Sequence, residues 1–168
     1  MESTQIVKKS RILASPDRVW TALTDASQLA TWFGAEFATP FVPGTRVVGR
    51  LVPTKVLPPV ARRRKAYTGL PIELDIEKVE PVRLLAFRWS PLALFSPEVK
   101  AAAASLVAME IAPDSLGSCL SITESDFEGM SGELLEKALE ANASGWTIQI
   151  RQLELFLSGA IDLRPVRD

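Results

Sequence analysis

Apolar and charged residues alternate strictly along one segment of the chain, in the order Ile72, Glu73, Leu74, Asp75, Ile76 and Glu77. Successive side chains of a β-strand point to opposite faces, so this pattern predicts a strand with one covered face and one face in water. Similar segments bounded by turn residues, such as Pro43-Gly44 and Glu80-Pro81, indicate further strands. We expect strands at residues 5–14, Ala35–Phe37, Arg46–Val52, Ile72–Glu80, Arg83–Ser90, Ser105–Ala112 and Cys119–Asp126.

Two short helices are expected after the first strand. Ser15 can cap exposed backbone amides, Pro16 suits the first helical position, and Asp17 suits the positive end of the helix dipole. The spacing of Asp25 and Gln28 resembles a capping box, which predicts that a second helix begins there. Together the two helices would bury an apolar side made of Val19, Trp20, Leu23, Leu29 and Trp32.

A long amphipathic helix is expected from about residue 132 to residue 157. Ser131 is a suitable cap for it and Gly159 a suitable stop. Gly145 lies in its interior, where glycine costs about 1 kcal/mol relative to alanine, so we expect it to pack closely against the sheet or a short helix. Apolar residues recur at helical spacing at Leu135, Leu139, Trp146, Ile150, Leu153 and Leu157.

The order of these elements predicts an α+β fold. Short connections between the strands favour an antiparallel sheet, and the regular βαβ alternation of a parallel sheet is missing. We therefore expect one domain over residues 1–168, with a core at about 6–158, in which a curved antiparallel sheet wraps around the C-terminal helix. Pro53–Pro71 is expected to be a loop, while residues 91–104 are compatible with a lid, an extended run or a short helix.

Composition removes several classes of chemistry. The chain has no histidine, which excludes Ser-His-Asp and Cys-His nucleophile systems and histidine zinc sites. A single cysteine, Cys119, excludes thiolate clusters and an intramolecular disulfide, and it fits a reducing compartment. We expect no cofactor, no metal and no membrane span, and the N-terminus lacks a signal-peptide core, so we expect a cytoplasmic protein.

Several short motifs occur in order along the chain: Val19-Trp20-x-Ala22-Leu23-Thr24, Trp32-Phe33, Pro43-Gly44, Glu80-Pro81 with Leu84-x-x-Phe87-Arg88-Trp89, Thr123-Glu124-Ser125-x-Phe127, and Gly145-Trp146. This pattern resembles the SRPBCC superfamily of START-like helix-grip proteins, and within it the branch related to the activator of heat-shock-protein ATPase. The resemblance spans about residues 6–157. It implies a helix-grip fold with a cavity beneath the long helix, although fold alone does not assign a function.

The chain departs from the family pattern at two places. Relatives often continue with His-Pro after the Phe-Arg-Trp motif, whereas this chain has Ser90-Pro91, so a role of that histidine would be absent here. The basic cluster Arg62-Arg63-Arg64-Lys65 is also unusual beside the family pattern. It could bind phosphate, RNA or an acidic partner, or it could be a solvated loop. Because the net charge is −1 and no RNA-binding motif is present, we expect no nucleic-acid function.

Residues expected to face the long helix form either a filled core or the lining of a ligand cavity. Periods of two and of 3.6 assign to this set Leu74, Ile76, Leu85, Phe87, Trp89, Leu120, Ile122, Glu124, Trp146, Ile150 and Leu153. A filled core is the ordinary outcome for such an apolar cluster. The family resemblance raises the prospect of a cavity instead.

Glu124 is the polar member of this set. It lies in phase with Leu120 and Ile122, so it should point inward, and a buried carboxylate needs partners or water. It could orient a ligand or act as an acid or base. Alternatively it could pair with Arg88 or Arg50, or lie exposed at the end of its strand.

Three functional hypotheses remain. The first is a protein that binds a small apolar or amphipathic molecule in a cavity walled by aromatic residues, with Glu124 and an arginine as polar anchors. The second is a protein-interaction or co-chaperone-like module that uses the outer sheet face or the 53–71 segment. The third is a cyclase-type or hydrolase-type enzyme that depends on Glu124, Tyr67 or an arginine, and we rank it last because no nucleophile stands out. No feature of the sequence indicates an oligomeric state.

Overall fold

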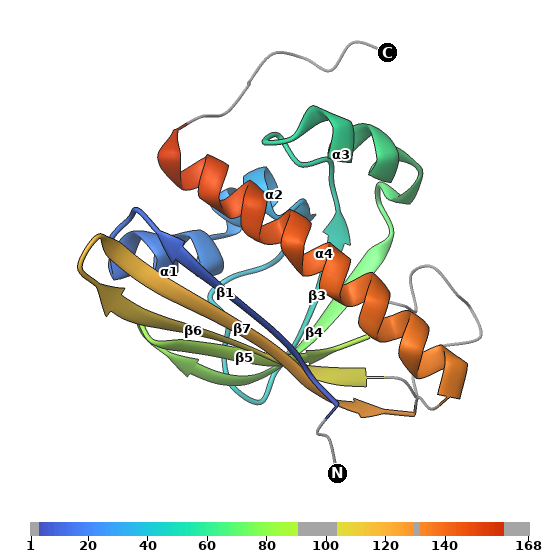
Figure 1. Ribbon diagram of the computed structural model, residues 1–168. Helices are drawn as coiled ribbons and strands as arrows, with labels where there is room; N and C mark the ends of the chain where they lie inside the picture. The colour runs from blue at the N-terminus through green and yellow to red at the C-terminus, as the bar shows by residue number, and fades with distance from the viewer. Residues whose placement is uncertain (1–3, 91–103, 130–131, 160–168) are drawn as a thin grey trace.

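The computed structural model describes residues 4–90, 104–129 and 132–159, which form a seven-stranded antiparallel sheet and the helices that cover one of its faces (Figure 1). The strands follow the order β1-β7-β6-β5-β4-β3-β2 across the sheet. The elements are β1 (Ile6–Ile12), α1 (Pro16–Thr24), α2 (Ala26–Trp32), β2 (Ala35–Glu36), β3 (Arg46–Leu51), α3 (Pro58–Arg64), the 3-10 turn η1 (Lys65–Tyr67), β4 (Pro71–Glu80), β5 (Leu84–Trp89), β6 (Ala104–Asp114), β7 (Gly117–Glu128) and α4 (Gly132–Ser158).

The predicted α+β helix-grip architecture is confirmed. α4 crosses the curved sheet diagonally, and α1 and α2 lie beside it after the first strand (Figure 1). Each predicted strand is present, with ends that differ by a few residues. Ser131 and most of the 91–104 segment lie outside the described residues. No helix among the described residues is long and apolar enough to cross a membrane.

The caps of the first two helices form as expected. The Ser15 hydroxyl accepts a hydrogen bond from the Arg18 amide at 3.3 Å. Asp25 caps α2 by accepting from the Ser27 hydroxyl at 2.7 Å and from the Gln28 amide at 3.0 Å. These two hydrogen bonds, from Ser27 and then from Gln28, hold the pKa of Asp25 below its usual value. Such caps satisfy amides that have no partner within the helix, and so define where each helix begins.

The segment Pro53–Pro71 is not the loop that we expected, because it contains α3 and η1. Proline breaks a helix in its interior but is well tolerated in the first turn, where its missing N–H has no intrahelical partner anyway. Pro58 and Pro59 stand at the start of α3, and the following Val60 and Ala61 are buried. The prolines therefore begin a helix here instead of preventing one.

Two β-bulges bend the sheet. The register between β6 and β7 shifts next to Ala104 and Leu106, where β7 contains one residue more than β6, and Asp126 takes a φ of 51°. A second shift separates Ile76 from Lys78 in β4. An extra residue in one strand increases the local twist, so these bulges help to make the face beneath α4 concave.

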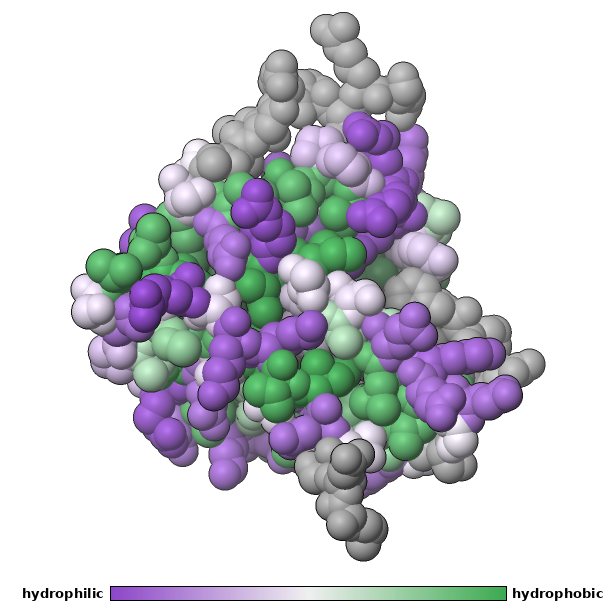
Figure 2. Space-filling view, viewed as in Figure 1, coloured by the Kyte–Doolittle hydropathy of each residue, from purple (hydrophilic) through white to green (hydrophobic). Residues whose placement is uncertain are grey.

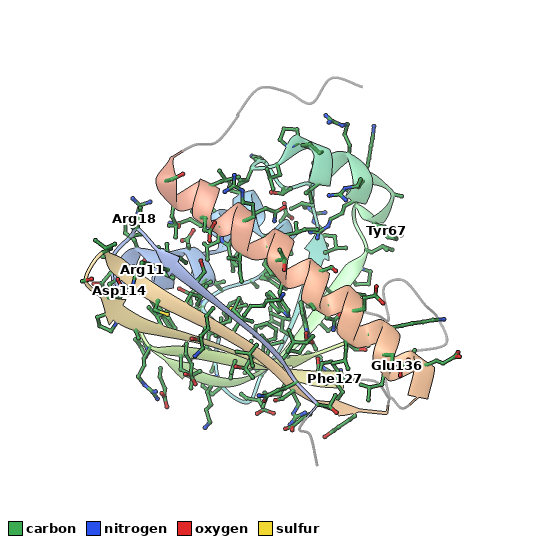
Figure 3. All side chains as sticks on the ribbon, viewed as in Figure 1. Arg11, Arg18, Tyr67, Asp114, Phe127 and Glu136 are labelled. Atoms are coloured by element: carbon green, nitrogen blue, oxygen red, sulfur yellow. The ribbon has the colours of Figure 1, made fainter. Side chains whose placement is uncertain are left out.

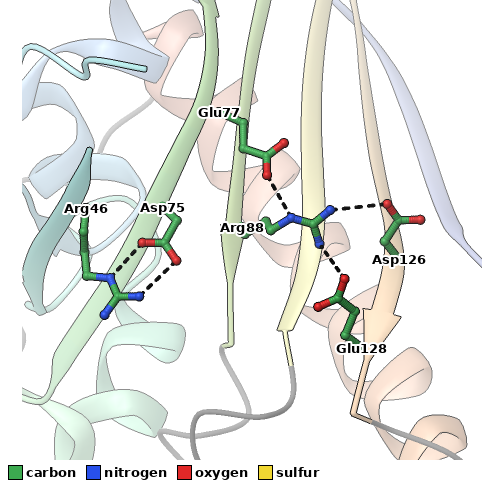
Figure 4. A network of polar contacts seen from close by, with 6 residues as sticks. All are labelled: Arg46, Asp75, Glu77, Arg88, Asp126 and Glu128. Atoms are coloured by element: carbon green, nitrogen blue, oxygen red, sulfur yellow. Dashed lines mark hydrogen bonds and ion pairs between the residues drawn. The ribbon is translucent and has the colours of Figure 1, made fainter. Parts of the chain in front are cut away.

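Paired charges cover the outer face of the sheet near both bulges (Figure 4). Arg88 of β5 donates to Glu77 at 2.8 Å and lies 3.5 Å from Asp126 and 3.7 Å from Glu128. Partial desolvation lowers the pKa of Arg88, but the hydrogen bond and charge of Glu77 and the other carboxylates outweigh it and raise the pKa. This part of the outer face is therefore covered by ion pairs.

Two buried glutamines attach α4 to the end of α2. The Gln152 amide donates to the Trp32 carbonyl oxygen at 2.8 Å and also to the Gln149 side-chain oxygen. Gln149 in turn donates to the Phe33 carbonyl oxygen at 3.1 Å. These carbonyls belong to the last turn of α2, where backbone acceptors lack helical partners. The glutamines therefore fix the position of the long helix over the short one.

We predict that Gln152→Met destabilises the protein by about 1–2 kcal/mol, because it leaves buried acceptors with fewer donors. The Trp32 carbonyl oxygen also accepts from the Thr54 hydroxyl at 3.0 Å, which limits the loss. Chemical denaturation measures the change. Gln28→Met is the matched control, since the Gln28 side chain is half-buried and is expected to change stability by less than about 0.5 kcal/mol. Equal stabilities for the two variants would contradict this account.

Candidate functional site

A cavity of about 240 Å³ lies between α4, the β3–β4 side of the sheet, and the α3–η1 segment. Its walls are mostly apolar, and Tyr67 follows α3 on one side of it (Figure 3). The lining residues are Phe33, Gly34, Leu51, Val52, Thr54, Arg64, Tyr67, Thr68, Ile72, Trp89, Ala141, Asn142, Gly145, Trp146 and Gln149. Binding pockets for small molecules typically combine such apolar walls with a few polar groups.

Glu124 is fully buried and accepts four hydrogen bonds beside this cavity. The indole N–H of Trp89 donates to its Oε2 at 2.9 Å, and that of Trp146 donates to its Oε1 at 3.0 Å. The Ser105 hydroxyl and the Asn142 amide donate to Oε2 at 2.5 and 3.2 Å. A carboxylate has about four lone-pair positions, so these donors use most of its capacity.

The sheet register brings these partners together. Glu124 of β7 lies opposite Val107 of β6, and Ser105, two residues earlier on the same strand, lies opposite Trp89 of β5. Asn142 and Trp146 are four residues apart on α4, so they share one face of that helix. Three strands and the long helix therefore converge on one carboxylate.

Glu124 points inward as predicted, and neither alternative holds, because it is fully buried and pairs with neither Arg88 nor Arg50. Arg88 binds the carboxylates of the outer sheet face, and Arg50 donates to Glu36 at 2.7 Å. Among the described residues, only neutral donors contact Glu124. Removing a carboxylate from water is costly unless other groups compensate for the lost hydration. Here hydrogen bonds provide that compensation in place of a cation.

Two of the predicted ligand-binding residues, Trp89 and Trp146, line the cavity. Their rings stack with centroids 5.4 Å apart and planes inclined by 30°. Glu124 lies behind them, and Ile150 is half-buried against the core. The remaining predicted residues are buried in the packed core, namely Leu74, Ile76, Leu85, Phe87, Leu120, Ile122 and Leu153.

Gly145 contradicts our packing expectation. A Cβ atom placed on it would meet no atom within 4 Å outside the helix itself, so the glycine does not allow a close approach. It lies instead at the wall of the cavity, one residue before Trp146. The missing side chain thus enlarges the open space beneath α4.

Arg64 is a cation on the opposite wall. Val60, Ala61 and Arg64 share one face of α3, because residues three and four positions apart are neighbours on a helix, whereas Arg62 and Arg63 are exposed. Burial, and then the nearby charge of Arg63, lower the pKa of the Arg64 guanidinium. The basic cluster is therefore helical and not a loop. Arg62 and Arg63 are solvated as expected, but Arg64 is half-buried beside an apolar space.

Sequence reasoning missed Ser105, Asn142, Gln149 and Arg64 as parts of the site. Two signals were available. Ser105 is in phase with buried Val107 on β6, and Asn142 precedes Trp146 by one helical turn. Arg64 could be recognised only once α3 was known to be helical. Among the described residues, no group of three or more acidic or cysteine side chains is placed to hold a metal ion.

Comparisons with known proteins agree on one fold. A family model described as "Activator of Hsp90 ATPase homolog 1-like protein" matches residues 13–158. No curated protein matches the chain in sequence.

Similar solved structures include the MLL2253 protein of Mesorhizobium loti, with a TM-score of 0.69, 20% identity, and coverage of 93% of this chain and 98% of that one. The SSP2350 protein of Staphylococcus saprophyticus has a TM-score of 0.66, 20% identity, and coverage of 96% of each chain. The Aha1 dimer of Colwellia psychrerythraea has a TM-score of 0.64 and 14% identity, and the match covers 92% of this chain and 96% of that one. At these identities the likeness establishes the fold.

We predict that Glu124→Gln destabilises the protein by about 1–3 kcal/mol, because the new amide N–H₂ group must face one of the buried donors. Thermal or chemical denaturation measures the change. Glu128→Gln, at an exposed position on the same strand, is the control and is expected to lose less than about 1 kcal/mol. A Glu124→Gln protein as stable as the control would show that the four hydrogen bonds do not matter for folding.

Proposed function

The chain belongs to the family described as "Activator of Hsp90 ATPase homolog 1-like protein", and from this premise we propose that it binds a small amphipathic molecule in the cavity beneath α4. Membership of this family supports a ligand-binding or Aha1-like module in general. The observation that carries the more specific proposal is an apolar cavity of about 240 Å³, walled by Trp146 and Gly145 on the helix and by Ile72 on the sheet.

The walls of the cavity are held rigidly, which favours binding. Each of the two indoles, Trp89 and Trp146, is anchored through its N–H to Glu124 and cannot turn without breaking a buried hydrogen bond. The Gln149 side chain at another part of the wall is fixed on the Phe33 carbonyl oxygen. A binding site that is ordered before the ligand arrives loses less conformational entropy when it binds.

The candidate catalytic residues, Glu124 and Tyr67, favour a binding function over catalysis. Four donors engage the Glu124 carboxylate, three on Oε2 and one on Oε1, so most of its acceptor capacity is used by the protein itself. Tyr67, the other candidate, already takes part in an interaction. A binding role needs only the shape and polarity of the cavity.

A protein-docking role would be favoured by a large exposed apolar patch. Figure 2 shows hydrophobic residues in separate groups between hydrophilic ones on the face that carries α4. Of the large exposed apolar side chains, Leu13 and Leu116 lie near the Ile12–Ser118 pair, whereas Val7 on β1 and Val48 on β3 lie toward opposite edges of the sheet. Scattered residues of this kind are normal on a protein surface. We therefore place the ligand in the cavity.

We predict that Gly145→Leu fills the cavity and blocks ligand binding without unfolding the protein. The uncharged dye N-phenyl-1-naphthylamine, which brightens in apolar surroundings, should bind the unaltered chain. Its affinity should fall by at least about tenfold in Gly145→Leu, because the leucine side chain occupies the space that the dye needs. Leucine also has the better helix propensity, so the melting temperature should stay equal or rise.

Ser144→Leu is the matched control, since Ser144 is exposed on the adjacent position of α4. It adds the same side chain outside the cavity and should leave dye binding unchanged. Equal binding by the unaltered chain and the Gly145→Leu variant, or no binding of the dye at all, would contradict the proposed function.

A further inference from the structure

The polar groups around the cavity have an uneven arrangement that indicates the charge of its ligand. Arg64 lines the cavity from the last turn of α3, and among the described residues no carboxylate lies within ion-pair distance of it. Arg62 and Arg63, the neighbouring cations, are exposed to water. Arg64 is thus the cation of this cluster that is turned toward the apolar space.

A half-buried guanidinium without an anion is unfavourable. Burial removes part of its hydration, and the positive charge of Arg63 repels it, and both effects lower the pKa of Arg64. An anion bound in the cavity would reverse this penalty. Arg64 also presents a planar set of donors that matches the two oxygens of a carboxylate.

The rest of the lining suits an apolar body and not a second charge. Trp146, Ile72 and Leu51 provide apolar wall, and the carboxylate behind the indoles is already engaged by its four donors. Glu124 lies on β7, and strands β6, β5 and β4 separate it in the sheet from β3, which leads into α3. The cation Arg64 and the carboxylate Glu124 therefore belong to different elements, α3 and β7.

The size of the cavity limits how much of a ligand it can cover. At about 240 Å³ it is smaller than the roughly 300–1,000 Å³ of pockets for drug-sized molecules. A long-chain lipid would not be enclosed. A chain of medium length, or a single aromatic ring system, fits this volume.

We propose that the ligand is a small amphipathic monocarboxylate, whose carboxylate pairs with Arg64 and whose apolar body lies against Trp146. This inference rests on the proposed function, because it assigns the chemistry of the ligand in the same cavity. It also gives the α3 segment a role, which is to supply the charge that selects among apolar molecules of similar size.

Displacement of bound N-phenyl-1-naphthylamine tests this inference with three ligands of equal chain length. Decanoate, 1-decanol and decylammonium share one apolar body and differ in the charge of the head group. In the unaltered chain, decanoate should displace the dye at concentrations at least about tenfold lower than decanol, and decylammonium should be the weakest. All concentrations stay below those at which the compounds form micelles.

Arg64→Gln should remove the preference for decanoate while leaving decanol displacement unchanged. Arg62→Gln, which removes an exposed charge from the same helix, is the matched control and should keep the preference. Thermal melts of both variants verify that they are folded. Equal displacement by decanoate and decanol in the unaltered chain, or an undiminished preference in Arg64→Gln, would overturn the role of Arg64 and leave the cavity as a site for neutral molecules. Failure of the dye to bind the unaltered chain would overturn the proposed function itself, and this inference with it.

Discussion

One buried carboxylate is the point at which three neighbouring strands and the long helix come together. Glu124 accepts hydrogen bonds from Trp89 on β5, Ser105 on β6, and Asn142 and Trp146 on α4. Apolar packing is tolerant of small displacements, whereas a hydrogen bond weakens steeply when its atoms move apart. The carboxylate therefore defines how far α4 stands from the sheet and how the two indoles are turned.

A second polar connection holds α4 at the opposite side of the cavity. Gln149 and Gln152 donate to the carbonyl oxygens at the end of α2, one and nearly two turns beyond Trp146. Within the first connection, between Asn142 and Trp146, the helix presents Gly145 to the cavity. The open space is thus maintained because the helix is fixed by polar contacts on each side of it and does not collapse onto the sheet.

The periodicity of the sequence was sufficient to predict the fold, including the inward orientation of Glu124. A period-two pattern involves only residues that are close in the sequence, so it can be recognised without knowledge of tertiary contacts. The partners of Glu124 depend on which strands are adjacent and on a register shift in β7, and neither can be read from local pattern. Gly145 shows the same limit: its place in the helix was predicted correctly, but whether an added side chain would meet atoms or open space depends on tertiary structure.

The α3 segment has a further consequence for where the charge beside the cavity stands. β3 and β4 are antiparallel neighbours, and a turn of about two residues is enough to join such strands. Most residues between Leu51 and Pro71 therefore add to this connection more than the pairing of β3 with β4 requires, and they form α3 and η1. The charge beside the cavity therefore stands on a connection between two strands, apart from the strands and the helix that hold Glu124 and its partners.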